Sequence, residues 1–369
     1  MELTFKVFNK IDELEEIWRS LCENKQDLSP FQEFELAKMV CDHYWPYWFV
    51  KRTVCRFYVF FDSQRPVLIL PIEKQLFSNK CWLFAVVHGF NYRDLICREQ
   101  KYISPCIALF NKEVAPLIVD GLPTDSPTYK AIEQTYEFQN AIKFENCFKI
   151  NFIDIINANL TIQNEVEEDR FELAYKTYFQ SLSKSVKQNL RTSYNRLEKQ
   201  EYNVKFLAYY GGGTLVVKNG NSLETKQIDS TEIRNLFDRI KTLYRERHVT
   251  RYGRSLLKER LLEKSFAVYS YENYPKALTL MITYNGELAG FMSGYVSRNG
   301  VYTVPRLAID DKFGFFSPGM MLINESIKYF IEHTEIKTMD LSKGNEAYKA
   351  KMGGSLFQIA DFIVDFNKK

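Results

Sequence analysis

The sequence predicts an α/β protein of the α+β type, with mixed sheets and two domains in tandem. The length of 369 residues corresponds to two domains at roughly 100–200 residues per domain. Apolar strands and amphipathic helices follow one another in both halves of the chain. Two Asn-Gly turns in series, near residues 285 and 299, predict an antiparallel meander ahead of a helix.

The first half begins with two helices, because apolar residues recur there at steps of three or four. Ser29-Pro30 is a typical helix start for the second of them. Strands, a helical region with proline interruptions, and a last strand follow. In chain order, these elements are expected at residues 11–21, 31–41, 56–61, 67–71, 82–88, 111–147 and 148–155.

A polar, acidic stretch from Asn157 to Arg170 separates the two halves. Such composition is typical of a linker. We therefore expect domains at residues 1–160 and 165–369.

The second half begins with an amphipathic helix whose apolar face runs from Phe179 to Leu197. Lys184, Lys187 and Arg191 form a basic stripe beside that face. This stripe is either a solvated flank or a phosphate-binding surface, and the sequence leaves both interpretations open. Gly211-Gly212-Gly213 joins two strands and lacks the spacing of a phosphate loop, which indicates a hairpin turn.

A basic cluster follows the helix predicted at 230–244. It comprises Arg245, Arg247, His248, Arg251 and Arg254. His248 is suited to deprotonating an amine, although a single histidine is more often structural. The arginines either bind phosphate or remain surface charges beside Glu246 and Glu259.

The C-terminal segment has the most regular pattern. The predicted order is three antiparallel strands, a loop, a helix, a strand, a short helix and a strand. They cover 277–284, 287–297, 301–309, 310–316, 317–333, 338–341, 345–352 and 356–366.

This order resembles the core of the GNAT acyltransferases, and short motifs point to the FemAB-like, BioF2-like branch of cell-envelope and exopolysaccharide proteins. The motifs are Tyr178-x-x-x-Leu182-Ser183-Lys184, Asn189-Leu190-Arg191, Arg196-Leu197-Glu198-Lys199, Ser317-Pro318-Gly319, Asp340-Leu341-x-x-Gly344-Asn345-x-x-Tyr348-Lys349 and Gly353-Gly354. Pro30-Phe31 and Tyr92-Arg93-Asp94 resemble the degenerate first domain of the same family.

The resemblance implies two tandem GNAT-like domains around a shared cleft, with acyl-CoA, most simply acetyl-CoA, as co-substrate. In the FemX-like architecture the chain end can return to the first domain, which leaves open to which domain Leu356–Lys369 belongs. CoA phosphates would lie at the loop and the following helix start, where free N–H groups and the helix dipole favour an anion. The residues concerned are Lys312, Gly314, Ser317, Gly319 and Met320. The loop does not match the common GNAT pattern Gln/Arg-x-x-Gly-x-Gly/Ala.

The resemblance also implies site residues. Tyr348 takes the place of the GNAT general acid, and an ordinary tyrosine pKa of about 10 keeps it protonated at neutral pH. Lys349 resembles the FemX-like lysine that faces the transferred group, and His248 is the candidate base. Acceptor-binding candidates are Lys187, Arg191, Arg251, Tyr92 and Asp94. For Tyr348, packing of the short helix is the competing interpretation.

The predicted reaction is acyl transfer to an amine on an amino sugar, a sugar nucleotide or a related envelope precursor. An aminoacyl-tRNA-dependent transferase and an inactive binding protein remain alternatives. A net charge of +3 produces little electrostatic attraction to nucleic acid. The seven cysteines form no CxxC pair and the four histidines show no ligand spacing, so no metal is expected. Without a signal peptide or a long apolar run, we expect a cytoplasmic protein with no membrane insertion.

Overall fold

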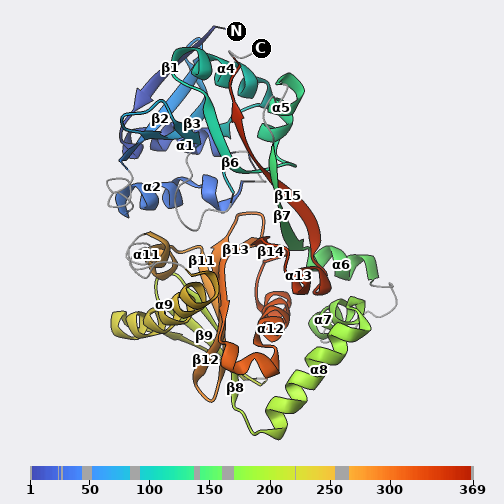
Figure 1. Ribbon diagram of the computed structural model, residues 1–369. Helices are drawn as coiled ribbons and strands as arrows, with labels where there is room; N and C mark the ends of the chain where they lie inside the picture. Colours follow the sequence, from blue (N-terminus) through green and yellow to red (C-terminus); the bar gives the residue numbers. More distant parts are fainter. Residues whose placement is uncertain are drawn as a thin grey trace. The chain divides into compact units, whose positions relative to one another are not determined.

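The computed structural model describes residues 2–366, except for 24, 26–27, 44–51, 84–91, 137–141, 160–169, 221 and 254–265. The chain divides into two compact units. Unit 1 comprises Met1–Cys147, Ser265–Ala267 and Phe357–Lys369, and unit 2 comprises Phe148–Lys264 and Val268–Leu356. Figure 1 shows the elements of both units.

The sheet of unit 1 is mostly antiparallel, in the order β1-β2-β3-β4-β6-β15, with β5 beside β3. Its strands are β1 (Leu3–Phe8), β2 (Thr53–Asp62), β3 (Arg65–Gln75), β4 (Cys81–Leu83), β5 (Ile96–Cys97), β6 (Leu117–Pro123) and β15 (Ser355–Val364). Among the described strands of this sheet, β4 and β6 are the one parallel pair, and helix α4 (Ile103–Glu113) lies between them in the chain.

Both faces of this sheet are covered by helices, so β2 and β3 carry long apolar runs. On one face, Trp18 of α1 (Glu15–Cys22) packs 6.1 Å from the Phe57 ring. On the other, Phe110 of α4 lies 5.0 Å from the Tyr58 ring. The remaining elements are η1 (Ile11–Leu14), η2 (Pro30–Gln32), α2 (Phe34–His43), η3 (Gln100–Tyr102), α5 (Pro127–Thr135) and β7 (Lys143–Ile150).

The sheet of unit 2 has the order β14-β13-β12-β11-β8-β9-β10. The strands are β8 (Val204–Tyr210), β9 (Thr214–Asn219), β10 (Ser222–Gln227), β11 (Ala277–Tyr284), β12 (Glu287–Val296), β13 (Val301–Ile309) and β14 (Thr338–Lys343). Asn285 and Gly286 have φ angles of 50° and 80°, which is the left-handed pair that a tight hairpin between β11 and β12 requires. The predicted meander is confirmed.

Helices cover the two faces of this sheet as well. Figure 1 shows α12 (Pro318–His333) and α9 (Ser230–Tyr252) on opposite sides of β13. The core beneath α12 includes Tyr302, Met339 and Phe330, all fully buried. The other helical elements are α6 (Phe152–Asn159), α7 (Arg170–Ser181), α8 (Lys184–Lys199), α11 (Phe266–Asn273), η5 (Asp311–Phe316) and α13 (Ala347–Lys351).

The two units share one connection pattern. An antiparallel meander ends in a strand, a helix crosses over, and the next strand pairs in parallel with the previous one. In unit 1 this is β4, α4 and β6, and in unit 2 it is β13, α12 and β14. The repetition confirms the predicted α/β class with two domains of similar topology.

Several predicted elements were wrong. Residues 111–147 contain β6, α5 and part of β7, rather than an interrupted helix, and 148–155 forms the end of β7 and the start of α6. The compact units divide at Cys147, whereas the predicted domains divide the chain at 160–165; residues 357–369 belong to unit 1, which is the alternative that the FemX-like architecture left open. Most of the strand expected at 82–88, most of the linker at 157–170, and the helix expected from 255 lie outside the described residues.

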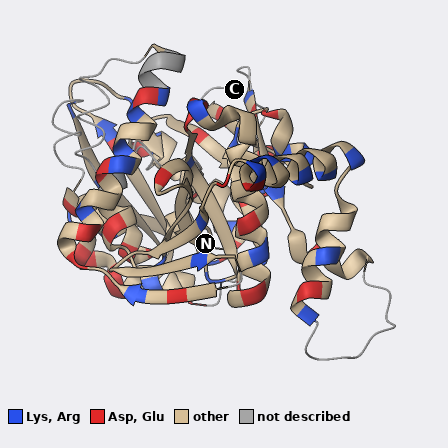
Figure 2. Ribbon diagram, turned by 90° about the horizontal axis from the view of Figure 1, so that it is seen from below, with Lys and Arg blue, Asp and Glu red and all other residues tan. Residues whose placement is uncertain are grey.

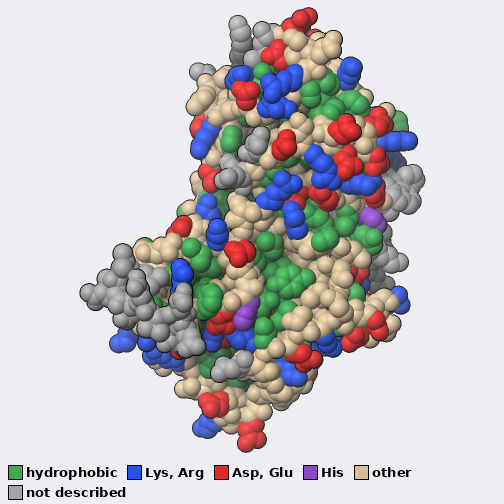
Figure 3. Space-filling view, turned by 180° about the vertical axis from the view of Figure 1, so that it is seen from behind, with side chains coloured by type: hydrophobic (Ala, Val, Ile, Leu, Met, Phe, Trp, Pro, Cys, Tyr) green, Lys and Arg blue, Asp and Glu red, His purple; other side chains and the backbone are tan. Residues whose placement is uncertain are grey.

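All seven cysteines are free thiols, and six of them are buried. No helix in the described part of the chain is long and apolar enough to cross a membrane. On the face that Figure 3 shows, basic and acidic side chains are interspersed.

Candidate active site

A fork in the sheet of unit 2 is the centre of the candidate site. Strands β13 and β14 run in parallel but pair only at Val301–Thr338, Tyr302–Met339 and Thr303–Asp340. Beyond this point β13 continues to Ile309 without β14 beside it. A parallel pair that separates partway along leaves room for a ligand between two strands.

A β-bulge lies at the position where the fork opens. Ser293 pairs with Arg306 and Tyr295 pairs with Thr303, so Val304 and Pro305 together oppose Gly294. Pro305 has no N–H to give to the ladder, which is why a bulge is one of the few places where a strand tolerates proline. A Cβ on Gly294 would lie 2.0 Å from the Thr303 carbonyl oxygen, so only glycine fits opposite the bulge. Bulges of this kind are frequent beside active sites, because they redirect side chains.

Buried polar side chains gather on the side of the fork away from α12. Thr303, Asp340 and Ser342 have 2%, 6% and 2% of their surface exposed. The Asp340 carboxylate accepts a hydrogen bond from the Ser342 N–H at 2.8 Å. On the same side, the Arg306 guanidinium lies 4.8 Å from the Tyr244 ring centroid of α9, with 6% of the residue exposed.

The loop after β13 forms the 3-10 helix η5 and ends at Ser317. Ser317 has φ 51° and ψ 51°, and this left-handed residue turns the chain from η5 into α12. Two of the first α12 amides, Met320 and Met321, both donate to the Ser317 carbonyl at 3.1 Å. Pro318 has no N–H, and the Gly319 N–H has no acceptor among the described residues. One donor at the positive end of α12 is therefore available to an anion.

Helix α8 holds this loop from outside the fork. Arg196 donates to the Phe315 carbonyl at 2.9 Å, and its guanidinium lies 3.9 Å from the centroid of that exposed ring. Ser317 Oγ donates to Asn189 Oδ1 at 3.1 Å. Lys312 forms an ion pair with Glu287 on its exposed side, and Gly314 is exposed with open space around it.

Lys349 is buried, with 3% of its surface exposed, beneath the end of β14. Its ammonium contacts the carbonyls of Ser342 and Lys343 at 3.3 and 2.6 Å, and Glu346 Oε2 at 3.1 Å. An ammonium has three N–H donors, so these three acceptors saturate it. Tyr348 is partly buried and packs on the α12 core cluster. The neighbouring helix positions thus point in different directions, as their spacing requires.

Helix α8 also carries the predicted basic stripe, with five basic residues and one acidic residue in its 16 positions (Figure 2). Lys187 donates to the Gln180 carbonyl at 2.8 Å, which caps the end of α7. Arg191 is exposed and its guanidinium lies 5.9 Å from the Phe179 ring centroid. The backbones of His248 and Arg251 belong to α9, while their side chains lie outside the description.

The remaining two candidates, Tyr92 and Asp94, belong to unit 1. Tyr92 is buried, and its ring lies 6.1 Å from Phe31 and 5.8 Å from Phe357. Asp94 lines a pocket that is described below.

Sequence reasoning missed Thr303, Arg306 and Asp340 as candidate site residues. Asp340 was part of a motif, but its place opposite Thr303 follows from the pairing of strands that are far apart in the chain. A proline within an otherwise regular strand, Pro305, was the one local signal of the bulge.

Comparison with known proteins supports this topology. Residues 184–350 match the family model described as an acetyltransferase (GNAT) domain. No curated protein shows significant sequence similarity to the chain. A conserved protein of unknown function from Bacteroides thetaiotaomicron has a similar structure, with a TM-score of 0.54 and 10% identity, over 97% of this chain and 100% of that one.

Two further similar structures have TM-scores of 0.46. A tandem GNAT protein from the clavulanic acid biosynthesis pathway is 11% identical, over 98% of both chains. FemX is 10% identical, over 99% of this chain and 98% of that one. The family match covers the fork, the loop and α12 of unit 2, and this part of the chain therefore contains an acetyltransferase (GNAT) domain.

Proposed function

We propose that the protein transfers an acyl group, most simply acetyl, from acyl-CoA to an amine on a sugar nucleotide or a related envelope precursor. The observation that carries this proposal is the fork between β13 and β14, with its bulge at Pro305 and the start of α12 beyond it. A thioester supplies an activated carbonyl, and in our proposal this carbonyl lies where the pairing of β13 and β14 ends, near the start of α12.

The residues at the start of α12 fit the phosphates of CoA. A Cβ built on Gly319 would meet only Ile309 Cγ2, at 3.4 Å, so the space before this helix end is open. The Gly319 N–H and the helix dipole both favour an anion there. Lys312 and Met320 flank the same turn.

The reaction releases CoA as a thiolate, and a nearby acid can assist by protonating the sulfur as the carbon–sulfur bond breaks. Tyr348 is our candidate for this acid. Lys349 has a different role in our proposal. Since its ammonium is saturated by Ser342, Lys343 and Glu346, it keeps the end of β14 in place beside the reacting groups.

The FemAB-like branch is part of the proposal, and it suggests a precursor of the cell envelope or of an exopolysaccharide as the acceptor. Arg191 and Arg251 are the candidate contacts to an acceptor phosphate. We also propose that the reaction takes place in the cytoplasm.

Calorimetric titration with acetyl-CoA tests the donor assignment. We expect Gly319→Val to abolish binding while Gly319→Ala weakens it, because the larger side chain fills the space at the helix start. Both variants should melt near the wild-type temperature, since no backbone atom opposes a Cβ there. Unchanged affinity in Gly319→Val, or no binding to the wild type, would contradict the proposal.

One observation favours a second candidate, an aminoacyl-tRNA-dependent transferase. The amides of η5 are turned inward: Lys312 N–H donates to Asp310 Oδ1 and Phe313 N–H to the Asp310 carbonyl. A loop whose amides are already paired has fewer donors for a pyrophosphate. If aminoacyl-tRNA supports transfer and acetyl-CoA does not bind, this second function is the correct one.

A further inference from the structure

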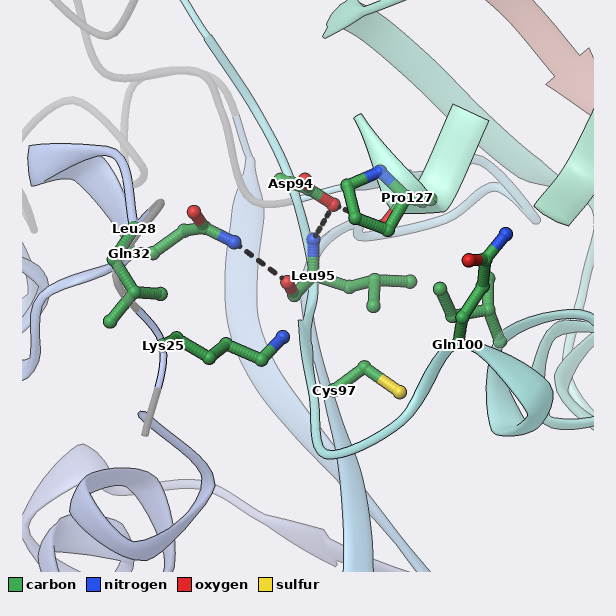
Figure 4. A pocket seen from close by; sticks show the side chains of 10 residues that line it. Lys25, Leu28, Gln32, Asp94, Leu95, Cys97, Gln100 and Pro127 are labelled. Atoms are coloured by element: carbon green, nitrogen blue, oxygen red, sulfur yellow. Dashed lines mark hydrogen bonds between the residues drawn. The ribbon is translucent and has the colours of Figure 1, made fainter. Parts of the chain in front are cut away.

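Unit 1 contains a pocket that is separate from the fork of unit 2. Its volume is about 60 Å³, which is room for several water molecules. The pocket is lined by segments after α1, before and after β5, and at the start of α5 (Figure 4). The lining residues used below are Lys25, Asp94, Leu28, Leu95, Ile103 and Pro127.

Asp94 has one carboxylate oxygen occupied and one available. Its Oδ1 accepts a hydrogen bond from the Leu95 N–H at 2.7 Å and another from the Thr128 hydroxyl. Its Oδ2 has no hydrogen-bond donor among the described residues. The carboxylate is thus fixed through one oxygen while the other has free acceptor capacity.

Lys25 supplies the opposite charge on the same pocket. Its ammonium has no hydrogen bond or ion pair with another described residue, and it comes no nearer than the ion-pair limit of 4.0 Å to the Asp94 carboxylate. Figure 4 shows the two side chains reaching the pocket from different segments of the chain. Two opposite charges therefore share one cavity without neutralising each other.

Two other polar groups of the pocket, Gln32 and Cys97, are already paired. The Gln32 amide donates to the Leu95 carbonyl at 2.9 Å and accepts from the Ser29 N–H at 3.1 Å. The Cys97 thiol lies 2.9 Å from the Glu99 carbonyl, and burial raises its pKa to about 11, so it stays protonated at neutral pH. Asp94 and Lys25 are thus the charged groups of the pocket with capacity left for a ligand, and the exposed Gln100 amide lies at the same pocket.

We propose that this pocket binds a small zwitterion, with the ammonium of the ligand at Asp94 and its carboxylate at Lys25. A cation alone would be opposed by Lys25, and an anion alone by Asp94, whereas a ligand with both charges satisfies both residues. The apolar walls formed by Leu28, Leu95, Ile103 and Pro127 suit a short hydrocarbon part. An α-amino acid with a small side chain has this chemistry.

The assay can be confined to unit 1, because all four tryptophans lie within its first segment, Met1–Cys147. Tryptophan fluorescence of the full chain therefore reports the thermal unfolding of this unit. The probes are L-alanine, methylammonium with the ammonium alone, and acetate with the carboxylate alone. We expect L-alanine to raise the unfolding temperature and to bind at least about tenfold more tightly than either single-charge probe.

Two variants test the named contacts. Asp94→Asn keeps the oxygen that Leu95 and Thr128 use but removes the negative charge, and Lys25→Met removes the positive charge at similar length. Each should weaken L-alanine binding by about tenfold or more, the factor expected for one charge-assisted hydrogen bond. The control Lys112→Met, on a lysine side chain that is 73% exposed in α4, should bind like the wild type.

Three results would overturn the proposal: no effect of L-alanine at millimolar concentration, equal binding of acetate or methylammonium, or unchanged L-alanine affinity in both variants. Because the pocket lies in unit 1, none of these results depends on whether acetyl-CoA binds to unit 2.

Discussion

Replacing Asp94 with asparagine should stabilise the protein at high pH but not at low pH. Burial raises the pKa of the Asp94 carboxyl from 3.8 to about 6, against the hydrogen bonds from Thr128 and Leu95 and the charge of Lys25. The folded state therefore holds this proton more tightly than the unfolded state. Its contribution to stability is fully present below about pH 4 and is lost as the pH rises towards 6.

The size of the effect follows from the shift. A difference of about 2 pKa units, at about 1.4 kcal/mol each, corresponds to a loss of about 2–3 kcal/mol between pH 4 and pH 8. Asparagine does not titrate, so Asp94→Asn does not have this loss. The free energy of unfolding of the variant, relative to the wild type, should thus rise by about 2–3 kcal/mol over that pH range.

Urea unfolding followed by tryptophan fluorescence measures this difference in unit 1 at each pH. Thr128→Val is a useful companion, because it removes a hydrogen bond that favours the charged carboxylate and should make the pH dependence steeper. A difference between Asp94→Asn and the wild type that stays constant from pH 4 to pH 8 would refute the reasoning. So would a variant that loses relative stability as the pH rises.

Three further predictions concern unit 2. Arg196→Ala should lower the free energy of unfolding by about 1–2 kcal/mol and make hydrogen exchange in η5 faster, since it removes contacts to the carbonyl and the ring of Phe315. Unchanged exchange would show that α8 does not hold this loop. Lys349→Met should lower the free energy of unfolding by about 1–3 kcal/mol in thermal unfolding, because it leaves the carbonyls of Ser342 and Lys343 without their donor, whereas a purely catalytic lysine would change activity alone. Tyr348→Phe should lower kcat by about 10²–10⁴ with little change in acetyl-CoA affinity, and full activity in this variant would assign Tyr348 to packing.

Local patterns predicted the elements that have strong turn or cap signals. The helix expected at 317–333 is α12 (Pro318–His333), because Pro at the first turn and a long apolar face act together. The strand β6 was missed because its short apolar run, Leu117–Pro123, lies between prolines and was assigned to an interrupted helix. Helix α6 was expected as a strand since its isoleucines and Phe152 favour both structures, and tertiary packing decides between them.

The sites depend on contacts that no local pattern contains. Thr303 and Asp340 come together through strand pairing across α12, and Lys25 and Asp94 come together through the packing of two loops. The motif around Lys349 was visible in the sequence, but its saturated ammonium follows from the backbone conformation after β14. Residue types therefore indicated where chemistry is possible, while strand register and burial determine which groups still have a hydrogen-bond donor, an acceptor or a charge available to a ligand.

Hydrogen exchange of the segment Asp311–Met321 in the presence of acetyl-CoA tests the central claim most directly. The free Gly319 N–H lies in this segment, at the start of α12. If the donor binds at the fork of unit 2, exchange in this segment should slow on addition of acetyl-CoA in the wild type and remain unchanged in Gly319→Val. Protection that appears only in segments of unit 1, or none at saturating acetyl-CoA, would contradict the assignment.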